Sequence, residues 1–484
     1  MIFNSLDFAW FLPLTFLIYW AIGPERRTAQ NYLLLGGSYL FYGWWSPWFL
    51  LLILASTITD YWIGKAMVHT DGPRRRRTLL WLSLGVNLGM LGYFKYANFF
   101  LDSFVNAFTF FGANFSADRL DIVLPVGISF YTFQTLSYTI DIYRKQLEPA
   151  TKFVNFAAYV SFFPQLVAGP IERARDLLPQ FQLRREFNYP QAVLGLRQVL
   201  WGLFKKMVVA DNCALVANQV FADPSAYPGS TLAIGVVLFG IQIYADFSGY
   251  SDIAIGTARL FGFEFRRNFR FPYFARGFRD FWQRWHISLT TWFRDYVYIP
   301  LGGNRAGMAW TAINTIIVFL ISGLWHGARW TFVVWGLMHA LLLLPGILLG
   351  RPRLPPPLDG TPRSLTSRLK TIAYILFTFT VITLTWVLFR AESFSDAAIY
   401  YGGLFSASLF SVPKGISLAL AAKALAVAGL LLSIEWVARD QEFGLAGPIV
   451  QLPRPVRWVT YSFLTLLIGL FAVSQETPFI YFQF

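Results

Sequence analysis

The sequence predicts an all-α polytopic membrane protein, and three observations support this fold class. Of its 484 residues, 56% are hydrophobic and only 14% are charged, whereas soluble proteins are about 45–50% apolar and about 25% charged. The mean hydropathy is +0.48. Apolar runs recur along the whole chain, and several approach the roughly 20 residues that a helix needs to cross a bilayer. We therefore expect a single membrane domain over residues 1–484.

The apolar runs predict about 10 to 12 transmembrane helices. The clearest runs are Phe8–Ile22, Asn31–Trp45, Trp48–Met67, Leu79–Tyr93, Ser230–Tyr244, Thr311–Ile321, Thr331–Leu349, Thr371–Leu388, Ile416–Val437 and Val459–Val473. Three weaker runs are Ile122–Tyr138, Phe153–Val167 and Gln191–Val209. Short runs of this kind can be tilted, re-entrant or merged with their neighbours.

Basic residues between the apolar runs predict the orientation of the chain. Arg26 and Arg27 follow the first run, and Arg74–Arg77 follow the third. By the positive-inside rule both loops are cytoplasmic, so the N-terminus faces outward. The first run lacks a basic start and a small-residue cleavage site, so we interpret it as a helix rather than a signal peptide.

The net charge of +14 is explained by such loops, which contact anionic lipid headgroups. We therefore predict a lipid bilayer and no nucleic acid among the partners. The single cysteine, Cys213, excludes a disulfide framework and a multi-cysteine metal site. We expect it to pack as a small apolar side chain and predict no metal site.

Four segments are expected within the membrane domain. Residues 1–120 form N-terminal helices, residues 121–349 a core with polar motifs, residues 350–370 a cytoplasmic loop, and residues 371–484 C-terminal scaffold helices. The loop contains the Pro- and Arg-rich stretch Arg351–Pro357, which is typical of an exposed connection.

The segment Phe261–Arg305 is too polar to span a membrane and too aromatic for a solvated loop. It predicts an amphipathic helix over Arg279–Tyr298 that lies at the headgroup level, followed by a turn at Gly302–Asn304. The apolar positions, which recur at steps of three and four, are Trp282, Trp285, Leu289, Trp292, Phe293 and Tyr296.

His326 is the first candidate for a catalytic residue, because ionisable groups in membrane segments are rare unless they are paired or functional. It follows Thr311–Ile321 and stands between Gly323 and Gly327, which allow a broken helix or a close approach of backbones. A neutral imidazole there could take a proton from an attacking hydroxyl. A structural histidine bonded to a backbone carbonyl is the equally open alternative.

Two further histidines lie nearby in the sequence. His286 stands on the predicted aromatic helix. The residues favour an interfacial anchor over a role in donor binding or proton transfer. His339 follows His326 by thirteen positions, which on one helix would place the two on different faces.

The segment Tyr244–Asp252 places Asp246 and Asp252 in an otherwise apolar helix. Tyr244, Ser248 and Asp252 are spaced by four residues and form one polar stripe. Interhelical hydrogen bonding explains the stripe better than a channel lining does. The sequence contains no Walker loop, dinucleotide fingerprint, zinc-helix motif or nucleophile elbow, which argues against an ATP-driven pump or a serine esterase.

Several motifs, found in order up to about His339, resemble those of the membrane-bound O-acyltransferases. They resemble most the bacterial branch that includes alginate O-acetyltransferases and the relatives that acetylate peptidoglycan and cellulose. The matching motifs are Pro125–Phe133, Val167–Arg173, Asp246–Asp252, Arg279–Ser288, Tyr296–Arg305 and Gly323–Gly327.

The resemblance implies an acyltransferase with a channel through its helices and an acyl donor at the cytosolic mouth of that channel. It implies that His326 is the catalytic base and that His286 supports the reaction. The residues that it suggests for donor binding or for the channel are Trp285, Arg284, Arg279, Asp246, Ser248, Asp252, Trp325 and Asn304.

Acetyl-CoA would be the donor substrate, with no further cofactor. The acceptor would be a polysaccharide or a periplasmic acetyltransferase partner, and the location the bacterial inner membrane. Two alternatives are a multi-pass transporter and a non-catalytic subunit of a polysaccharide export or modification complex. The sequence shows no internal repeat of the kind that transporters often have, which counts against the first alternative.

Overall fold

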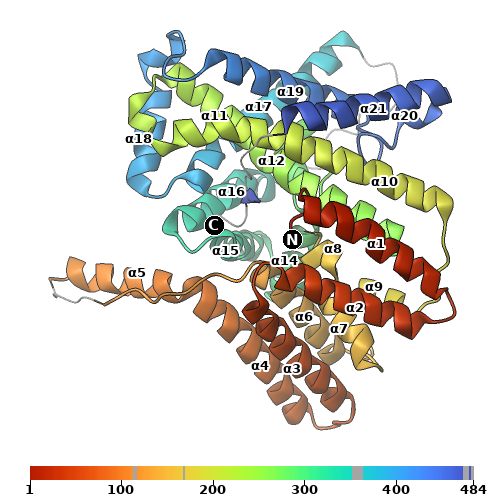
Figure 1. Cartoon of the computed structure of the whole chain (residues 1–484). Coiled ribbons are helices and arrows are strands. Elements are labelled where there is room, and N and C mark those ends of the chain that lie inside the picture. Colours follow the sequence, from red (N-terminus) through yellow and green to blue (C-terminus); the bar gives the residue numbers. More distant parts are fainter. Residues whose placement is uncertain (113–116, 167–168, 351–363, 473–478, 481–484) are drawn as a thin grey trace. The chain divides into compact units, whose positions relative to one another are not determined.

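The computed structural model describes residues 1–112, 117–166, 169–350, 364–472 and 479–480 (Figure 1). Over these residues the regular secondary structure is helical, with no β-strand, which confirms the predicted all-α class. The chain divides into two compact units. The first unit comprises Met1–Val199 and Ile253–Arg266, and the second comprises Leu200–Asp252 and Arg267–Phe484.

The first unit is built from short and medium helices around buried polar contacts. In α3 and α4, which lie side by side in Figure 1, Asp60 accepts hydrogen bonds from Ser83 (2.5 Å) and Asn87 (2.8 Å). Such bonds hold helices together where no water competes for the polar groups. The elements of this unit are α1 (Leu6–Ile22), α2 (Arg27–Gly43), η1 (Pro47–Phe49), α3 (Leu50–Val68), α4 (Pro73–Leu91), η2 (Gly92–Tyr96), α5 (Ala97–Phe110), α6 (Ile128–Tyr143), α7 (Phe153–Ser161), α8 (Phe163–Leu166), α9 (Ala174–Leu177), η3 (Leu178–Phe181), and parts of α10 (Tyr189–Leu203) and α12 (Gly229–Leu260).

The second unit contains most of the long apolar helices and every histidine except His69. It also contains α12 as far as Asp252; the whole helix has 32 residues. Its other elements are η4 (Phe204–Ala210), α11 (Asp211–Ala222), η5 (Pro224–Ala226), η6 (Pro272–Phe274), α13 (Phe278–Trp282), α14 (Ile287–Phe293), η7 (Arg294–Tyr298), α15 (Met308–His326), α16 (Trp330–Leu348), α17 (Leu365–Arg390), α18 (Phe394–Leu404), η8 (Ala407–Phe410), α19 (Leu418–Val437), α20 (Pro448–Gln451) and α21 (Arg454–Phe471).

Helices α15 and α16 form a tightly packed pair, drawn side by side in Figure 1. A Cβ atom on Gly323 would lie 2.3 Å from the backbone oxygen of Phe332, and one on Gly336 would lie 2.2 Å from that of Phe319. Glycine at both positions therefore lets the two backbones touch, as small residues do between membrane helices. This contact fixes the C-terminal end of α15 against α16.

Six described helical segments are long and apolar enough to cross a membrane. They confirm a polytopic membrane protein, while the predicted total of about 10 to 12 crossings stays a prediction. A shorter apolar helix among the described residues is α1, with 17 residues. The six segments are Pro47–Val68, Gly229–Leu260, Met308–His326, Trp330–Leu348, Leu365–Arg390 and Leu418–Val437.

The predicted continuous helix over Arg279–Tyr298 is wrong. The chain leaves the helical conformation after Trp282, and His286 adopts a left-handed conformation with φ of 41° before α14 begins. Two backbone bonds cause the break: the N–H of Arg270 donates to the carbonyl of Arg284, and that of Ile287 donates to the carbonyl of Asn268, both at 2.8 Å. The aromatic side chains of this segment are buried rather than displayed on one surface.

Two weaker helix predictions also need correction. The helix expected from Ile122 begins only at Ile128, after Gly127 with φ of 75°. The run Phe153–Val167 is interrupted at Phe162, between α7 and α8. The stretch Arg351–Pro357 lies outside the described residues, and the four-segment division of the chain stays a prediction.

Candidate active site

His326 is the last residue of α15 and is 2% exposed. The helix continues through Gly323, so of the two possibilities that the glycines allow, the structure has the close approach of backbones at this position. The imidazole is surrounded by rings from three helices. Its centroid lies 5.0 Å from that of Trp325, 5.2 Å from that of Trp335 on α16, and 5.5 Å from that of Phe389 on α17.

His286 is fully buried in the turn between α13 and α14. Its Nδ1 lies 3.1 Å from Oδ1 of Asn268, and its ring centroid lies 4.6 Å from that of Phe247 on α12. A side chain at this depth does not fit the interfacial anchor that the residues favoured, because anchors place their polar end in the headgroup layer.

The three histidines of the second unit alternate with two tryptophans. The Trp325 ring centroid lies 6.0 Å from His286 and 5.0 Å from His326, and the Trp335 centroid lies 5.2 Å from His326 and 4.7 Å from His339. We call these five residues the histidine–tryptophan ladder. His339 belongs to it because the chain turns after His326 and starts a second helix, so the prediction that treated both as positions on one helix was wrong.

The surroundings of the ladder keep at least one of its imidazoles neutral. Burial lowers the pKa of His286 to about 3, because an apolar environment disfavours the charged form. A neutral imidazole has one nitrogen with a lone pair that can accept a proton. A neutral imidazole that can accept a proton is therefore present in the ladder at His286.

The other residues predicted around His286 have different settings. Trp285 is fully buried, and its centroid lies 5.2 Å from that of Phe269 and 5.1 Å from that of Trp386. Arg284 pairs with Asp280, with 2.6 Å from Nε to Oδ1. Arg279 and Asn304 are exposed and belong to none of the ring contacts of the ladder. The structure thus brings Trp325 and His286 to His326, but not Arg279 or Asn304.

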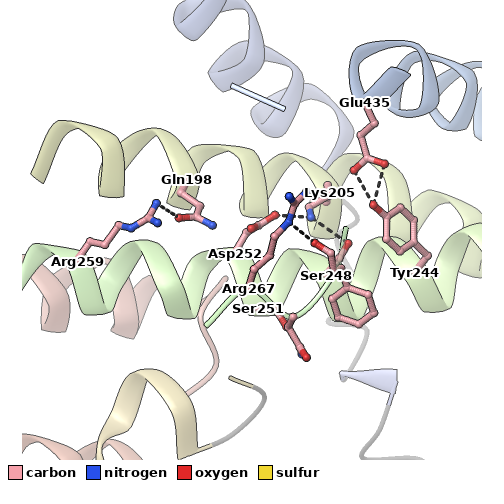
Figure 2. A network of polar contacts seen from close by, with 11 residues as sticks. Gln198, Lys205, Tyr244, Ser248, Ser251, Asp252, Arg259, Arg267 and Glu435 are labelled. Atoms are coloured by element: carbon pink, nitrogen blue, oxygen red, sulfur yellow. Dashed lines mark hydrogen bonds and ion pairs between the residues drawn. The ribbon is translucent and has the colours of Figure 1, made fainter. Parts of the chain in front are cut away.

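The polar stripe of α12 forms the interhelical bonds that its spacing predicted (Figure 2). The Lys205 ammonium donates to Oγ of Ser248 at 2.9 Å and forms an ion pair with Asp252. The Tyr244 hydroxyl lies 2.8 Å from both carboxylate oxygens of Glu435 on α19. The predicted interhelical bonding is therefore present, while a channel role for Asp246, Ser248 and Asp252 stays a prediction.

Asp246 lies beside a second buried lysine. The Lys206 ammonium lies 2.9 Å from Oδ1 of Asp246 and 2.8 Å from Oδ1 of Asp211, and the Lys206 side chain is 1% exposed. The backbone N–H of Ile480 donates to Oδ2 of Asp246 at 2.7 Å. We call these groups together the charged network; its members are Lys205, Lys206, Asp211, Tyr244, Asp246, Ser248, Asp252 and Glu435.

Sequence reasoning missed Asn268, Glu435 and the two lysines. A signal for the lysines was present, because two adjacent charges inside the apolar run Gln191–Val209 call for partners. Cys213 is buried, as predicted. Within the described part of the chain, no three His, Cys, Asp or Glu side chains are grouped so that they could hold a metal ion.

Comparison with known proteins identifies a family and several relatives of this chain. Residues 147–389 match the sequence model of the membrane-bound O-acyltransferase family. The chain is 41% identical to the probable alginate O-acetylase AlgI of Pseudomonas putida, over 84% of this chain and 80% of that protein. The matched range of the family contains the whole histidine–tryptophan ladder and both buried lysines.

Two more distant relatives act on other polymers according to their names. The chain is 36% identical to the peptidoglycan O-acetyltransferase of Helicobacter pylori, over 82% of this chain and 78% of that protein. It is 28% identical to the teichoic acid D-alanyltransferase of Bacillus subtilis, over 46% of this chain and 59% of that protein. Transfer of an acyl group is common to the names of all three relatives.

Proposed function

The chain belongs to the membrane-bound O-acyltransferase family, and we propose that it takes an acetyl group from cytosolic acetyl-CoA for O-acetylation of an exopolysaccharide such as alginate outside the bacterial inner membrane. The family makes it an acyltransferase and a multi-pass membrane protein. The observation that carries the finer proposal is the ladder, which surrounds His326 with aromatic rings at the end of a helix long enough to span a membrane.

In this proposal His326 is the general base. Its imidazole takes the proton of an acceptor hydroxyl, and the hydroxyl oxygen attacks the thioester carbonyl of acetyl-CoA. The new C–O ester bond forms, the C–S bond breaks, and the thiolate of CoA leaves and takes up a proton. General base catalysis of this kind contributes about 10²- to 10⁴-fold in rate. His286 supports the step through Trp325, which contacts both imidazoles.

The arginines around α13 are proposed to attract the phosphates of the donor. Arg279 is exposed and available to an anion, whereas Arg284 already pairs with Asp280. Guanidinium groups suit phosphates because their planar donors bind two oxygens at once. Arg279 is therefore the better candidate of the two, and Asn304, which is also exposed, stays a candidate for the same surface.

Acetyl is preferred as the acyl group because the relatives at 41% and 36% identity are named for O-acetylation, whereas the D-alanyl relative is 28% identical. An exopolysaccharide is preferred over peptidoglycan for the same reason. The acetyl group reaches the polymer either directly or through a periplasmic acetyltransferase partner. In the second case the attacking hydroxyl belongs to that partner.

The test measures acetate that mild base releases from surface polysaccharide of cells carrying wild-type protein, His326→Ala, His69→Ala or a deletion. His69 is a matched control because it is an exposed histidine between α3 and α4. We expect acetate to fall equally in the deletion and in His326→Ala, at unchanged protein level, and to be unchanged in His69→Ala.

Purified protein with acetyl-CoA labelled in its acetyl group provides the second measurement. If the wild type removes label from the donor and His326→Ala does not, the result supports an enzyme that uses His326. Acetylation that persists in His326→Ala cells would refute the base assignment and favour a non-catalytic subunit. Acetate that is unchanged even in the deletion would refute the proposed reaction as a whole.

A further inference from the structure

We propose that Asn268 is a positioning residue that holds His286 in the tautomer with hydrogen on Nδ1, so that Nε2 presents its lone pair within the ladder. This inference rests on the proposed function, since it assigns a state to an imidazole beside the reacting groups. It is carried by the hydrogen bonds of one buried amide.

Asn268 is 0% exposed and connects three parts of the second unit. Its Oδ1 accepts the backbone N–H of Ser288 at 3.3 Å and the Ser288 hydroxyl at 2.9 Å, and it lies 3.1 Å from Nδ1 of His286. Its Nδ2 donates to Oγ of Ser251 on α12 at 3.1 Å. Its own carbonyl accepts the N–H of Ile287 at 2.8 Å.

These contacts fix which atom of the amide faces the imidazole. A backbone N–H can only donate, so the amide atom that meets the N–H of Ser288 is the oxygen. An amide oxygen can only accept, so Nδ1 of His286 must carry a hydrogen. Ser251 completes the assignment by accepting from the NH₂ group on the other side.

A neutral imidazole carries one ring hydrogen, so with Nδ1 protonated the Nε2 atom holds a lone pair. Burial keeps the ring neutral by lowering the pKa of His286 to about 3. Among the described residues, the groups that face it are Asn268, Phe269, Ser288 of α14, Phe247 of α12, and Trp325 of α15. None of these five groups is titratable.

Two features of His286 are unfavourable for stability, and both point to a functional role for this residue. Nε2 is buried and has no hydrogen-bond partner among the described residues. The backbone of His286 is left-handed, with φ of 41°, although the residue is not glycine. Such strain persists only where surrounding bonds hold it, and it gathers at functional sites. The bonds of Asn268 to Ile287 and Ser288, the two residues that follow His286, hold this turn.

Nitrogen-15 NMR of the full-length protein, labelled in histidine only, tests the assignment directly. The chain has four histidines, so a spectrum of His286→Gln identifies the signals of His286 by difference. We expect the wild type to show hydrogen on Nδ1 of His286. In Asn268→Leu, which removes the acceptor, we expect a mixture with hydrogen on Nε2, since a free imidazole can carry it on either nitrogen.

Transfer kinetics against pH provide a readout that a purely structural role would not change. In Asn268→Leu we expect kcat to fall about 10- to 100-fold with KM unchanged, as when partners that orient other functional imidazoles are removed. Asn268→Asp keeps an acceptor and adds a negative charge, which raises the pKa of His286. The acid limb of its pH–rate profile should therefore move to higher pH, with part of the activity restored.

Asn314→Leu is the matched control. Asn314 is also buried, at 2% exposure, but it donates to the carbonyls of Leu301 and Gly303 in another turn. This variant should keep the wild-type tautomer and the wild-type pH–rate profile per folded molecule.

Hydrogen on Nε2 of His286 in the wild type would overturn the proposal, and so would an Asn268→Leu protein with an unchanged tautomer and pH–rate profile. If Asn268→Leu does not fold, the wild-type spectrum decides, because hydrogen on Nδ1 of His286 is expected there without any change at Asn268. The NMR result does not depend on activity. A wrong proposed function and a wrong tautomer assignment are therefore told apart.

Discussion

The charged network and the histidine–tryptophan ladder are both buried in the second unit, yet they satisfy their polar atoms in different ways. In the network, Lys205 and Lys206 face carboxylates, and the Tyr244 hydroxyl faces Glu435. In the ladder, Nε2 of His286 and Nδ1 of His339 have no hydrogen-bond partner among the described residues. Charges that are already paired hold helices together, whereas a neutral nitrogen without a partner keeps the capacity to form a hydrogen bond.

This difference implies that the two regions fail in different ways when changed. Removing one member of a buried ion pair leaves an uncompensated charge, which is strongly destabilising. Replacing a neutral imidazole among aromatic rings leaves no charge behind, so the main loss is chemical. Stability and turnover, measured on the same variants, should separate the network from the ladder.

The largest expected effect is on turnover at the ladder. His326→Gln keeps a side chain of similar size but cannot act as a base, so transfer from labelled acetyl-CoA should fall about 10²- to 10⁴-fold. Its unfolding midpoint in detergent should stay close to that of the wild type. A variant that unfolds readily but turns over normally per folded molecule would reverse the comparison and make His326 structural.

The second effect is on stability at the network. Lys206→Met leaves Asp211 and Asp246 without the ammonium that lies 2.8 Å and 2.9 Å from them. We expect the free energy of unfolding to fall by about 3–5 kcal/mol, with turnover per folded molecule retained. Lys152→Met, at an exposed lysine, is the control and should change stability little. Lost turnover in a stable Lys206→Met protein would instead support a channel role for Asp246.

The sequence predicted the long helices well because apolar run length is a local property. The runs Thr331–Leu349 and Ile416–Val437 correspond to α16 and α19 within two residues at each end. The break before His286 was not predictable in this way, because the backbone bonds that cause it come from Asn268 and Arg270. The local pattern of Arg279–Tyr298 is helical, and tertiary bonding overrides it.

For the candidate site, the sequence predicted individual residues but not the contacts between them. The motifs indicated His286 and His326, but their contact through Trp325 needed the fold. The bond between Tyr244 and Glu435 joins positions 191 residues apart. Spacing along one helix indicates a polar stripe and cannot name partners on a helix so distant in the sequence.

A smaller effect is expected at the edge of the network. Tyr244→Phe removes the hydroxyl that lies 2.8 Å from both oxygens of Glu435. A buried acceptor that loses its donor costs about 1–3 kcal/mol, and this should appear in chemical unfolding experiments. Tyr400→Phe is a suitable control, because the buried Tyr400 hydroxyl donates to a backbone carbonyl, that of Leu232, rather than to a carboxylate. A larger loss in the control than in Tyr244→Phe would contradict the special place of Glu435.

The effect expected to be smallest near neutral pH is the dependence of stability on pH, and it tests whether His286 is neutral in the folded protein. Burial lowers the pKa of His286 to about 3, against about 6.5 in the unfolded chain. Between these two values the unfolded chain binds a proton that the folded protein does not, so stability is full above about pH 6.5 and falls as the pH decreases. The slope from this group is about 1.4 kcal/mol per pH unit. His286→Gln should remove that part of the slope, while His69→Ala, at an exposed histidine, should leave it. An unchanged slope in His286→Gln would mean that the buried imidazole takes up its proton in the folded protein, and the ladder would then be a charged site like the network.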